Sequence, residues 1–193
     1  MFKKLLFLAF IFILLARTEF GWAENFNFRH TRWGMTQDEV IGSEEKMVPV
    51  EKTRHLIRYK IQILDKNVEL LYLFALDKLI GSSYKLDDNY LNSQHFITTY
   101  NKFKQALVRK YGRPDEEITD WLNETYKINR TKWGLALSLG HTKYASIWNT
   151  DHTTIESNLR ESDHNVLCFI EYRSTEYSHL FAEISKEHKI DPF

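Results

Sequence analysis

The 193-residue chain has little cysteine, glycine or proline, and no excess of charge of either sign. It contains 1 Cys, 7 Gly and 3 Pro, so collagen-like and Pro/Gly-rich disordered material is excluded, and so is an internal disulfide. The 26 basic and 26 acidic side chains cancel, and because a nucleic-acid binder needs Lys and Arg in excess or on one face, we expect no nucleic-acid partner. Stability must come from a hydrophobic core, which the 43% hydrophobic and 15% aromatic content can supply.

An apolar run stands near the start of the chain, behind Lys3 and Lys4. It covers residues 5–16, which is too short to span a bilayer comfortably but typical of a secretory signal. A small-x-small triplet at residues 21–23 predicts cleavage after it, so residues 1–23 are predicted to be a signal peptide; the alternative is an uncleaved membrane anchor. We expect the mature protein to be periplasmic or secreted and to contain no integral membrane segment.

The first half of the mature chain predicts a helix followed by three strands. Thr36 and Glu39 have the spacing of a capping box, which predicts a helix from about Gln37. Apolar and polar residues alternate from Leu56 to Ile63, as in a strand with one buried face. Two further strands are predicted at residues 68–75 and 79–86, after a turn at 65–67.

The second half repeats the order of a helix followed by strands. An apolar stripe from Phe96 to Tyr111, spaced by three and four, predicts an amphipathic helix that ends at Gly112. Strands are predicted at 117–128, 143–148, 153–159 and 165–172, and a last amphipathic helix at 175–188. The predicted fold class is α+β: two tandem helix-plus-antiparallel-meander units, residues 24–91 and 92–193, with a C-terminal amphipathic helix. Since each unit has only about 70 to 100 residues, we expect them to share a core.

Sequence motifs of known chemistry are missing. There is no Gly-x-Ser-x-Gly elbow, no glycine-rich phosphate loop and no pair of histidines at metal-ligand spacing, so no cofactor and no metal are predicted. His141, Asp151 and His152 are the best candidate catalytic group, because they would converge if the strand between them folded back; the alternative is three solvated loop residues. Cys168 lies in an apolar strand, which favours a buried side chain over a nucleophile. The acidic pairs at residues 44–45 and 116–117 are predicted to be solvated.

Tryptophans offer better support for recognition than for catalysis. The predicted mature chain holds four of them, each beside a polar or charged residue, and aromatic anchors with polar neighbours are common in binding patches. Trp33 and Trp148 are the predicted binding residues. The alternative is that tryptophans fill the core, and at least two of the four are expected to do so.

Several stretches resemble known protein groups. Phe28-Arg29, Trp33-Gly34-Met35-Thr36 and Glu39-Val40 resemble the start of a group of uncharacterised exported bacterial proteins, and the resemblance extends in pieces to residue 174 and implies no activity. Gly34-Met35-Thr36 and Gly112-Arg113-Pro114 are also similar to small outer-membrane assembly lipoproteins of the SmpA/OmlA type and to their relatives with a β-lactamase-inhibitor-like fold. This second resemblance implies a helix-on-sheet fold.

The sequence therefore predicts an exported, non-catalytic binding or scaffold protein of the bacterial envelope. Its partner would be another protein or an envelope component. The alternative function is a small exported hydrolase that uses His141, Asp151 and His152.

Overall fold

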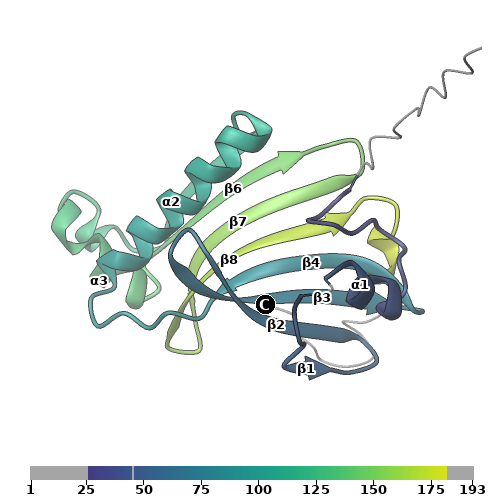
Figure 1. Cartoon of the computed structure of the whole chain (residues 1–193). Helices are drawn as coiled ribbons and strands as arrows, with labels where there is room; N and C mark the ends of the chain where they lie inside the picture. Colours follow the sequence, from purple (N-terminus) through teal and green to yellow (C-terminus); the bar gives the residue numbers. More distant parts are fainter. Residues whose placement is uncertain (1–25, 45, 182–193) are drawn as a thin grey trace, which may run out of the picture.

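A computed structural model describes residues 26–44 and 46–181 of the chain. These residues form a mixed α+β structure around one eight-stranded antiparallel sheet with the order β1-β2-β3-β4-β8-β7-β6-β5 (Figure 1). The strands are β1 (Glu51–Lys52), β2 (Leu56–Ile63), β3 (Lys66–Ala75), β4 (Lys78–Leu86), β5 (Glu116–Trp121), β6 (Thr142–Asn149), β7 (Thr153–Ser162) and β8 (Asn165–Ser174). The helices are α1 (Gln37–Ser43), α2 (Gln94–Tyr111) and α3 (Trp133–Ser138), with short 3₁₀ helices η1 (Glu124–Tyr126) and η2 (Arg130–Lys132).

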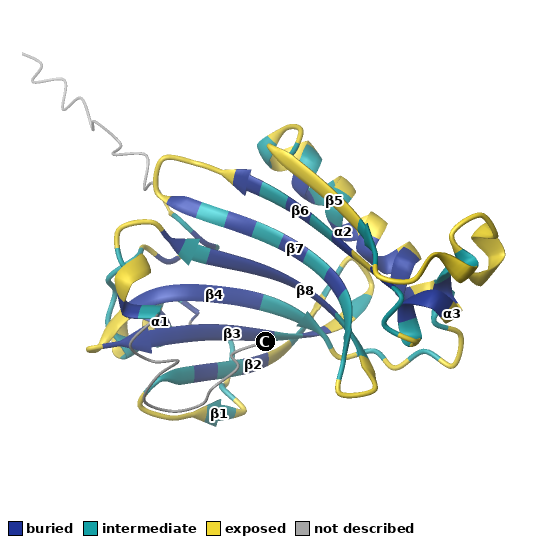
Figure 2. Ribbon diagram, turned by 180° about the vertical axis from the view of Figure 1, so that it is seen from behind, coloured by how far each residue is buried: buried dark blue, intermediate teal, exposed yellow. Residues whose placement is uncertain are grey.

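The sheet is continuous across its middle, where β4 and β8 pair. Their register runs from Gly81 opposite Arg173 to Lys85 opposite Phe169, and the view from behind shows these two strands side by side (Figure 2). One hydrophobic cluster contains both Leu70 of β3 and Leu159 of β7, each fully buried. The core is therefore shared by strands on both sides of the β4–β8 pair.

Three of the hairpins turn on two residues that both have positive φ. This geometry matches the right-handed twist of the flanking strands, and it is adopted here without glycine. The turns are Leu64–Asp65 (φ 50° and 61°), Leu76–Asp77 (49° and 57°) and Asp163–His164 (50° and 64°). The turn predicted at residues 65–67 is thus shorter and begins one residue earlier, so that Lys66 already belongs to β3.

The first two of the three predicted helices form where the sequence placed them. Thr36 caps α1, and its capping box with Glu39 is complete. The apolar stripe of α2 is buried, and Gly112, with φ 85°, ends the helix. Helix α2 packs against β7 and β8, so it covers only one part of this face of the sheet (Figure 1).

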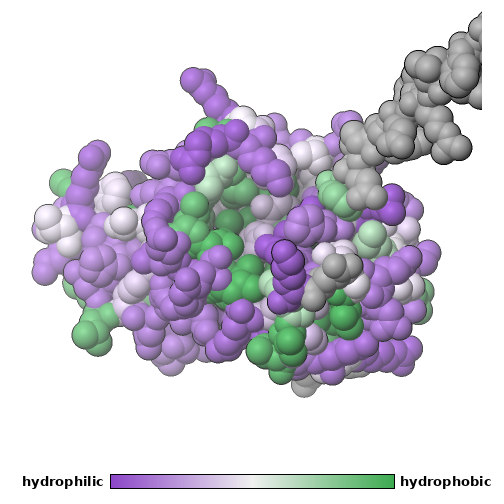
Figure 3. Space-filling view, in the orientation of Figure 1, coloured by the Kyte–Doolittle hydropathy of each residue, from purple (hydrophilic) through white to green (hydrophobic). Residues whose placement is uncertain are grey.

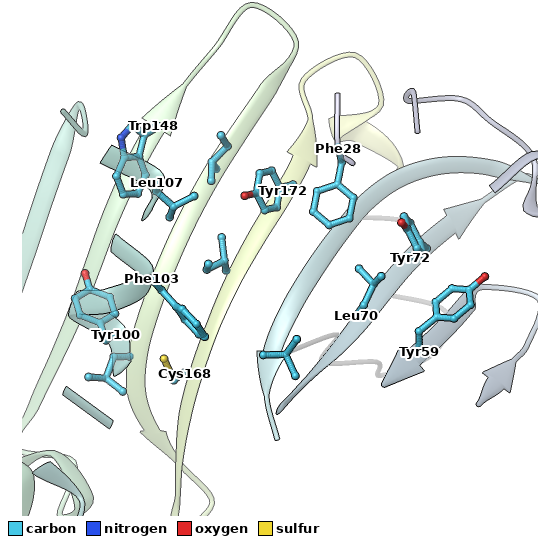
Figure 4. Packing of buried hydrophobic residues seen from close by; sticks show 14 of the residues in the cluster. Phe28, Tyr59, Leu70, Tyr72, Tyr100, Phe103, Leu107, Trp148, Cys168 and Tyr172 are labelled. Carbon is cyan, nitrogen blue, oxygen red and sulfur yellow. The ribbon is translucent and has the colours of Figure 1, made fainter. Parts of the chain in front are cut away.

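The segment before α1 covers another part of the same face. Phe28 is buried, and its ring lies 5.7 Å from that of Tyr72, 5.1 Å from Tyr84 and 4.7 Å from Tyr172. Figure 4 shows the Phe28 ring between Tyr172 and Tyr72, while Phe103 and Leu107 of α2 lie on the other side of Tyr172. The part of the sheet face that lies between α2 and the segment before α1 borders a groove, which is described below.

The chain departs from the prediction between β5 and β6. The strand predicted at 117–128 ends at Trp121, because two 3₁₀ helices follow it. Asn123 and Asn129 cap them by accepting hydrogen bonds from the backbone N–H groups of Thr125 and Thr131. Helix α3 was not predicted.

Two predictions lie wholly or partly outside the described residues. The signal peptide, residues 1–23, is outside them. Of the predicted C-terminal helix, residues 175–188, the structure describes residues 175–181, of which 178–181 are helical. In the described ranges, no helix has both the length and the apolar character needed to cross a membrane.

Candidate functional site

A groove lies between α2 and the middle of the sheet. Its walls are mostly apolar, and its volume is about 220 Å³. Figure 3 shows this area as an apolar hollow in the face that α2 partly covers. The side chains that form its apolar wall are Ile63, Leu64, Phe103, Ala106, Leu107 and Ile170. We call this feature the groove.

A second, more polar hollow lies at the other side of the C-terminal end of α2. It has a volume of about 330 Å³ and is lined by Asn27, Tyr111, Asp151, His152 and Thr153, among others. Carboxylate, imidazole, hydroxyl and amide groups all reach it. We call this feature the hollow.

Lys110 lines both the groove and the hollow. It is exposed on the last turn of α2, where a cation is favoured by the helix dipole, and its ammonium lies 4.9 Å from the centre of the Tyr111 ring. Within the described residues no carboxylate pairs with it. The rings of Tyr111, which lines the hollow, and Tyr172, which lines the groove, lie 6.5 Å apart between the two features, and burial raises the pKa of Tyr172 well above its usual value.

A buried polar cluster anchors the segment before α1 to the sheet. Arg29 donates two hydrogen bonds to Glu44, of 2.7 and 2.9 Å, and the Tyr72 hydroxyl donates a third, of 2.5 Å. The side chain of Glu44 is only 3% exposed and that of Arg29 is 24% exposed. Burial alone would raise the pKa of Glu44, but the hydrogen bonds from Arg29 and Tyr72 outweigh it and hold that pKa below its usual value.

Two more tyrosines border this polar cluster. Tyr84, which also lines the groove, lies near the Arg29 charge, and burial outweighs that charge and raises the pKa of Tyr84. The Tyr59 hydroxyl is buried without a hydrogen-bond partner among the described residues, and its pKa is raised by burial and by the nearby charge of Glu44. The polar cluster therefore touches the groove through Tyr84.

The two predicted binding tryptophans differ in burial and in their contacts. Trp148 is 2% exposed, and its indole N–H donates to the Gly112 carbonyl, so its prediction as a surface anchor was wrong. It points to the same face of β6 as Tyr144 and Ser146, toward α2. Trp33 is half-buried, and its indole N–H donates to Thr153, which lines the hollow.

The predicted catalytic group does not converge. His141 precedes β6, whereas Asp151 and His152 follow it. The eight residues of β6, at about 3.3 Å each, place the two ends roughly 26 Å apart. A proton relay among the three side chains is therefore excluded, although Asp151 and His152 remain together in the hollow.

Sequence reasoning missed the importance of Glu44. It predicted a solvated carboxylate, whereas this side chain is buried and fully paired. Its partners Arg29 and Tyr72 lie 15 and 28 residues away, so no local pattern signals the cluster. Cys168 is buried as a small apolar side chain, and burial raises the pKa of its thiol to about 12.

Comparison of the chain with known proteins found no match. This holds for protein-family models, for curated proteins and for solved structures. Within the described residues there is also no group of three His, Cys, Asp or Glu side chains that could hold a metal ion. The function is therefore argued from the groove, the hollow and the polar cluster.

Proposed function

We propose that this protein is a non-catalytic binding protein of the bacterial envelope, and that its groove holds the apolar part of a small anionic amphiphile. The observation that carries the proposal is the pairing of an apolar groove with the exposed ammonium of Lys110 at its border. An alkyl chain or ring would replace water along Ile63, Leu107 and Ile170. An acidic head group would lie beside Lys110, toward the hollow.

Charge at the border of the groove favours an anionic ligand over a cationic one. Lys110 is the charged side chain that lines both features, and no described carboxylate neutralises it. Asp151 also lines the hollow, where it would discourage a second negative charge and favour a hydroxyl or amide. A ligand with one anionic group and an apolar tail agrees with both the positive charge of Lys110 and the negative charge of Asp151.

Binding is favoured over catalysis by the placement of the reactive side chains. Cys168 is buried with a raised pKa, and His141 lies at the opposite end of β6 from Asp151 and His152. Among these residues, no nucleophile is therefore shown with a general base within hydrogen-bond reach. The hydrolase alternative loses the three-residue group on which it was based.

The proposal extends to location and architecture. The predicted signal peptide supports a periplasmic or secreted protein. The order of the sheet, with β1–β4 and β5–β8 each in sequence and each preceded by a helix, supports two tandem helix-plus-meander units joined through β4 and β8. In that arrangement the groove lies where the two units meet.

Calorimetric titration with straight-chain carboxylates tests the ligand class. From butanoate to octanoate, each added methylene should tighten binding roughly fourfold, because burial of one methylene is worth about 0.8 kcal/mol, and the gain should stop once the groove is full. Octyltrimethylammonium, which has the same chain and the opposite charge, should bind more weakly than octanoate. Equal affinity for the two, or no binding by either, would contradict the proposal.

Paired variants locate the binding to the groove. Ala106→Trp fills the groove and should abolish octanoate binding, whereas Gln105→Trp on the exposed side of α2 should not change it. Lys110→Gln should weaken octanoate binding, and Arg109→Gln is its control on the same helical turn. Similar effects of a variant and its control would place the ligand elsewhere.

A further inference from the structure

A small lobe projects from the structure between β5 and β6. It consists of residues 122–141, which include η1, η2 and α3 (Figure 1). Four large aliphatic side chains on this lobe face solvent instead of the core: Leu122 (69% exposed), Ile128 (97%), Leu135 (41%) and Leu139 (52%). So many exposed aliphatic side chains in a segment of this length mark an interaction surface.

The local backbone brings three of these four residues into one part of the lobe. Leu135 lies in α3 and Leu139 caps its C-terminal end one helical turn later, so the two residues lie on one side of the helix. The backbone N–H of Leu122 donates to the carbonyl of His141, 2.8 Å away, which brings the start of the lobe beside its end, two residues after Leu139. Ile128 stands between η1 and η2 and is almost completely exposed.

Aromatic side chains help to hold the lobe together. The rings of Trp121 and Trp133 meet edge to face, with their centres 5.9 Å apart. The indole N–H of Trp133 donates to the carbonyl of Lys127, which fixes the segment that carries Ile128. Both tryptophans are half-buried, so the most exposed apolar side chains of the lobe are the aliphatic ones.

The lobe is basic within a chain of formal net charge 0. It carries Lys127, Arg130 and Lys132 against one acidic residue, Glu124. Glu124 pairs with Lys127 at 2.6 Å, and the Arg130 guanidinium lies 5.5 Å from the Trp133 ring. In the described part of the chain, Lys132 is exposed and has no carboxylate partner.

We propose that this lobe docks the protein on an anionic lipid surface, with its aliphatic side chains in the interface and its cations at the head groups. Exposed aliphatic side chains next to cations are what peripheral membrane sites use, because insertion and attraction to anionic lipid reinforce each other. A protein partner is less well matched, since protein interfaces are centred on large aromatic side chains, whereas the most exposed apolar side chains of the lobe are aliphatic. The proposal does not depend on the ligand of the groove.

Co-sedimentation with lipid vesicles tests the docking. The protein should bind vesicles of phosphatidylglycerol and phosphatidylethanolamine, and it should bind phosphatidylcholine vesicles at least tenfold more weakly. Raising the salt from 50 to 500 mM should weaken the binding. Ile128→Ser should lower the partition coefficient roughly tenfold, and Lys132→Gln should lower it roughly fivefold.

A matched control separates docking from loss of fold. Val48 is 86% exposed on a distant loop, so Val48→Ser should bind vesicles like the unchanged protein. Ile128→Ser should keep its thermal unfolding midpoint, since Ile128 makes almost no buried contact. Absence of binding to anionic vesicles, equal binding to both vesicle types, or equal effects of Ile128→Ser and Val48→Ser would overturn the proposal and favour a protein partner for the lobe.

Discussion

Replacing Arg29 by Met tests the role of the buried polar cluster in stability. The variant keeps the length of the side chain but leaves the Glu44 carboxylate, which is 3% exposed, with only the Tyr72 hydroxyl as a donor. Removing one partner of a buried ion pair costs about 3 to 5 kcal/mol. Because Arg29 is itself 24% exposed, we expect about 3 kcal/mol, the lower end of that range, at pH 7.

The effect of this variant should depend on pH. In the unchanged protein the pKa of Glu44 is lowered, so its contribution to stability is present above the unfolded pKa of about 4.3 and is lost as the pH falls through the lower folded value. Without Arg29, burial dominates and raises the pKa of Glu44 above that of the unfolded chain. The variant therefore loses stability as the pH rises above about 4.3, and the difference from the unchanged protein should be larger at pH 7 than at pH 4.5.

Urea unfolding followed by circular dichroism measures these differences. Arg29→Met with Glu44→Gln should recover part of the loss, because the buried charge is gone. Lys127→Met, which breaks the exposed pair with Glu124, is the control and should cost less than 1 kcal/mol. A cost below 1 kcal/mol for Arg29→Met at pH 7, or a cost that does not change between pH 4.5 and 7, would refute the reasoning.

Three further predictions concern single positions. Gly134→Ala should destabilise the protein by more than about 1 kcal/mol, since an added Cβ would lie 2.4 Å from the backbone nitrogen of Gln94, whereas Gly42→Ala, with open space around it in α1, should be neutral or stabilising; thermal unfolding compares the two. Cys168 should react with a thiol reagent only in denaturant, and fast labelling of the native protein would contradict its burial. Mass spectrometry of the processed protein should find an N-terminus at Glu24, and an intact Met1 in a carbonate-resistant membrane fraction would contradict cleavage.

Local patterns in the sequence predicted most of the regular elements. The capping box of Thr36 and Glu39 placed α1, and alternation from Leu56 to Ile63 gave the exact bounds of β2. The same alternation applies to β6, where Tyr144, Ser146 and Trp148 share the buried face, so the burial of Trp148 could have been predicted from the strand. The caps formed by Asn123 and Asn129 also have a local signal in the sequence, because each asparagine begins an Asn-x-Thr triplet.

The candidate site depends on contacts that no local pattern encodes. Lys110 lines both the groove and the hollow because of the position and direction in which α2 packs on the sheet. The pairing of Arg29 with Glu44 depends on how the segment before α1 folds back over β3. The separation of His141 from Asp151 and His152 follows from β6 being a full extended strand between them.

The proposal of a ligand in the groove is tested most directly by an NMR titration with octanoate that follows the methyl groups of the protein. The largest shifts should occur at Ile63, Leu107 and Ile170, they should saturate together, and they should vanish in Ala106→Trp. Shifts confined to the lobe at residues 122–141, or no saturable shift in the groove, would contradict it.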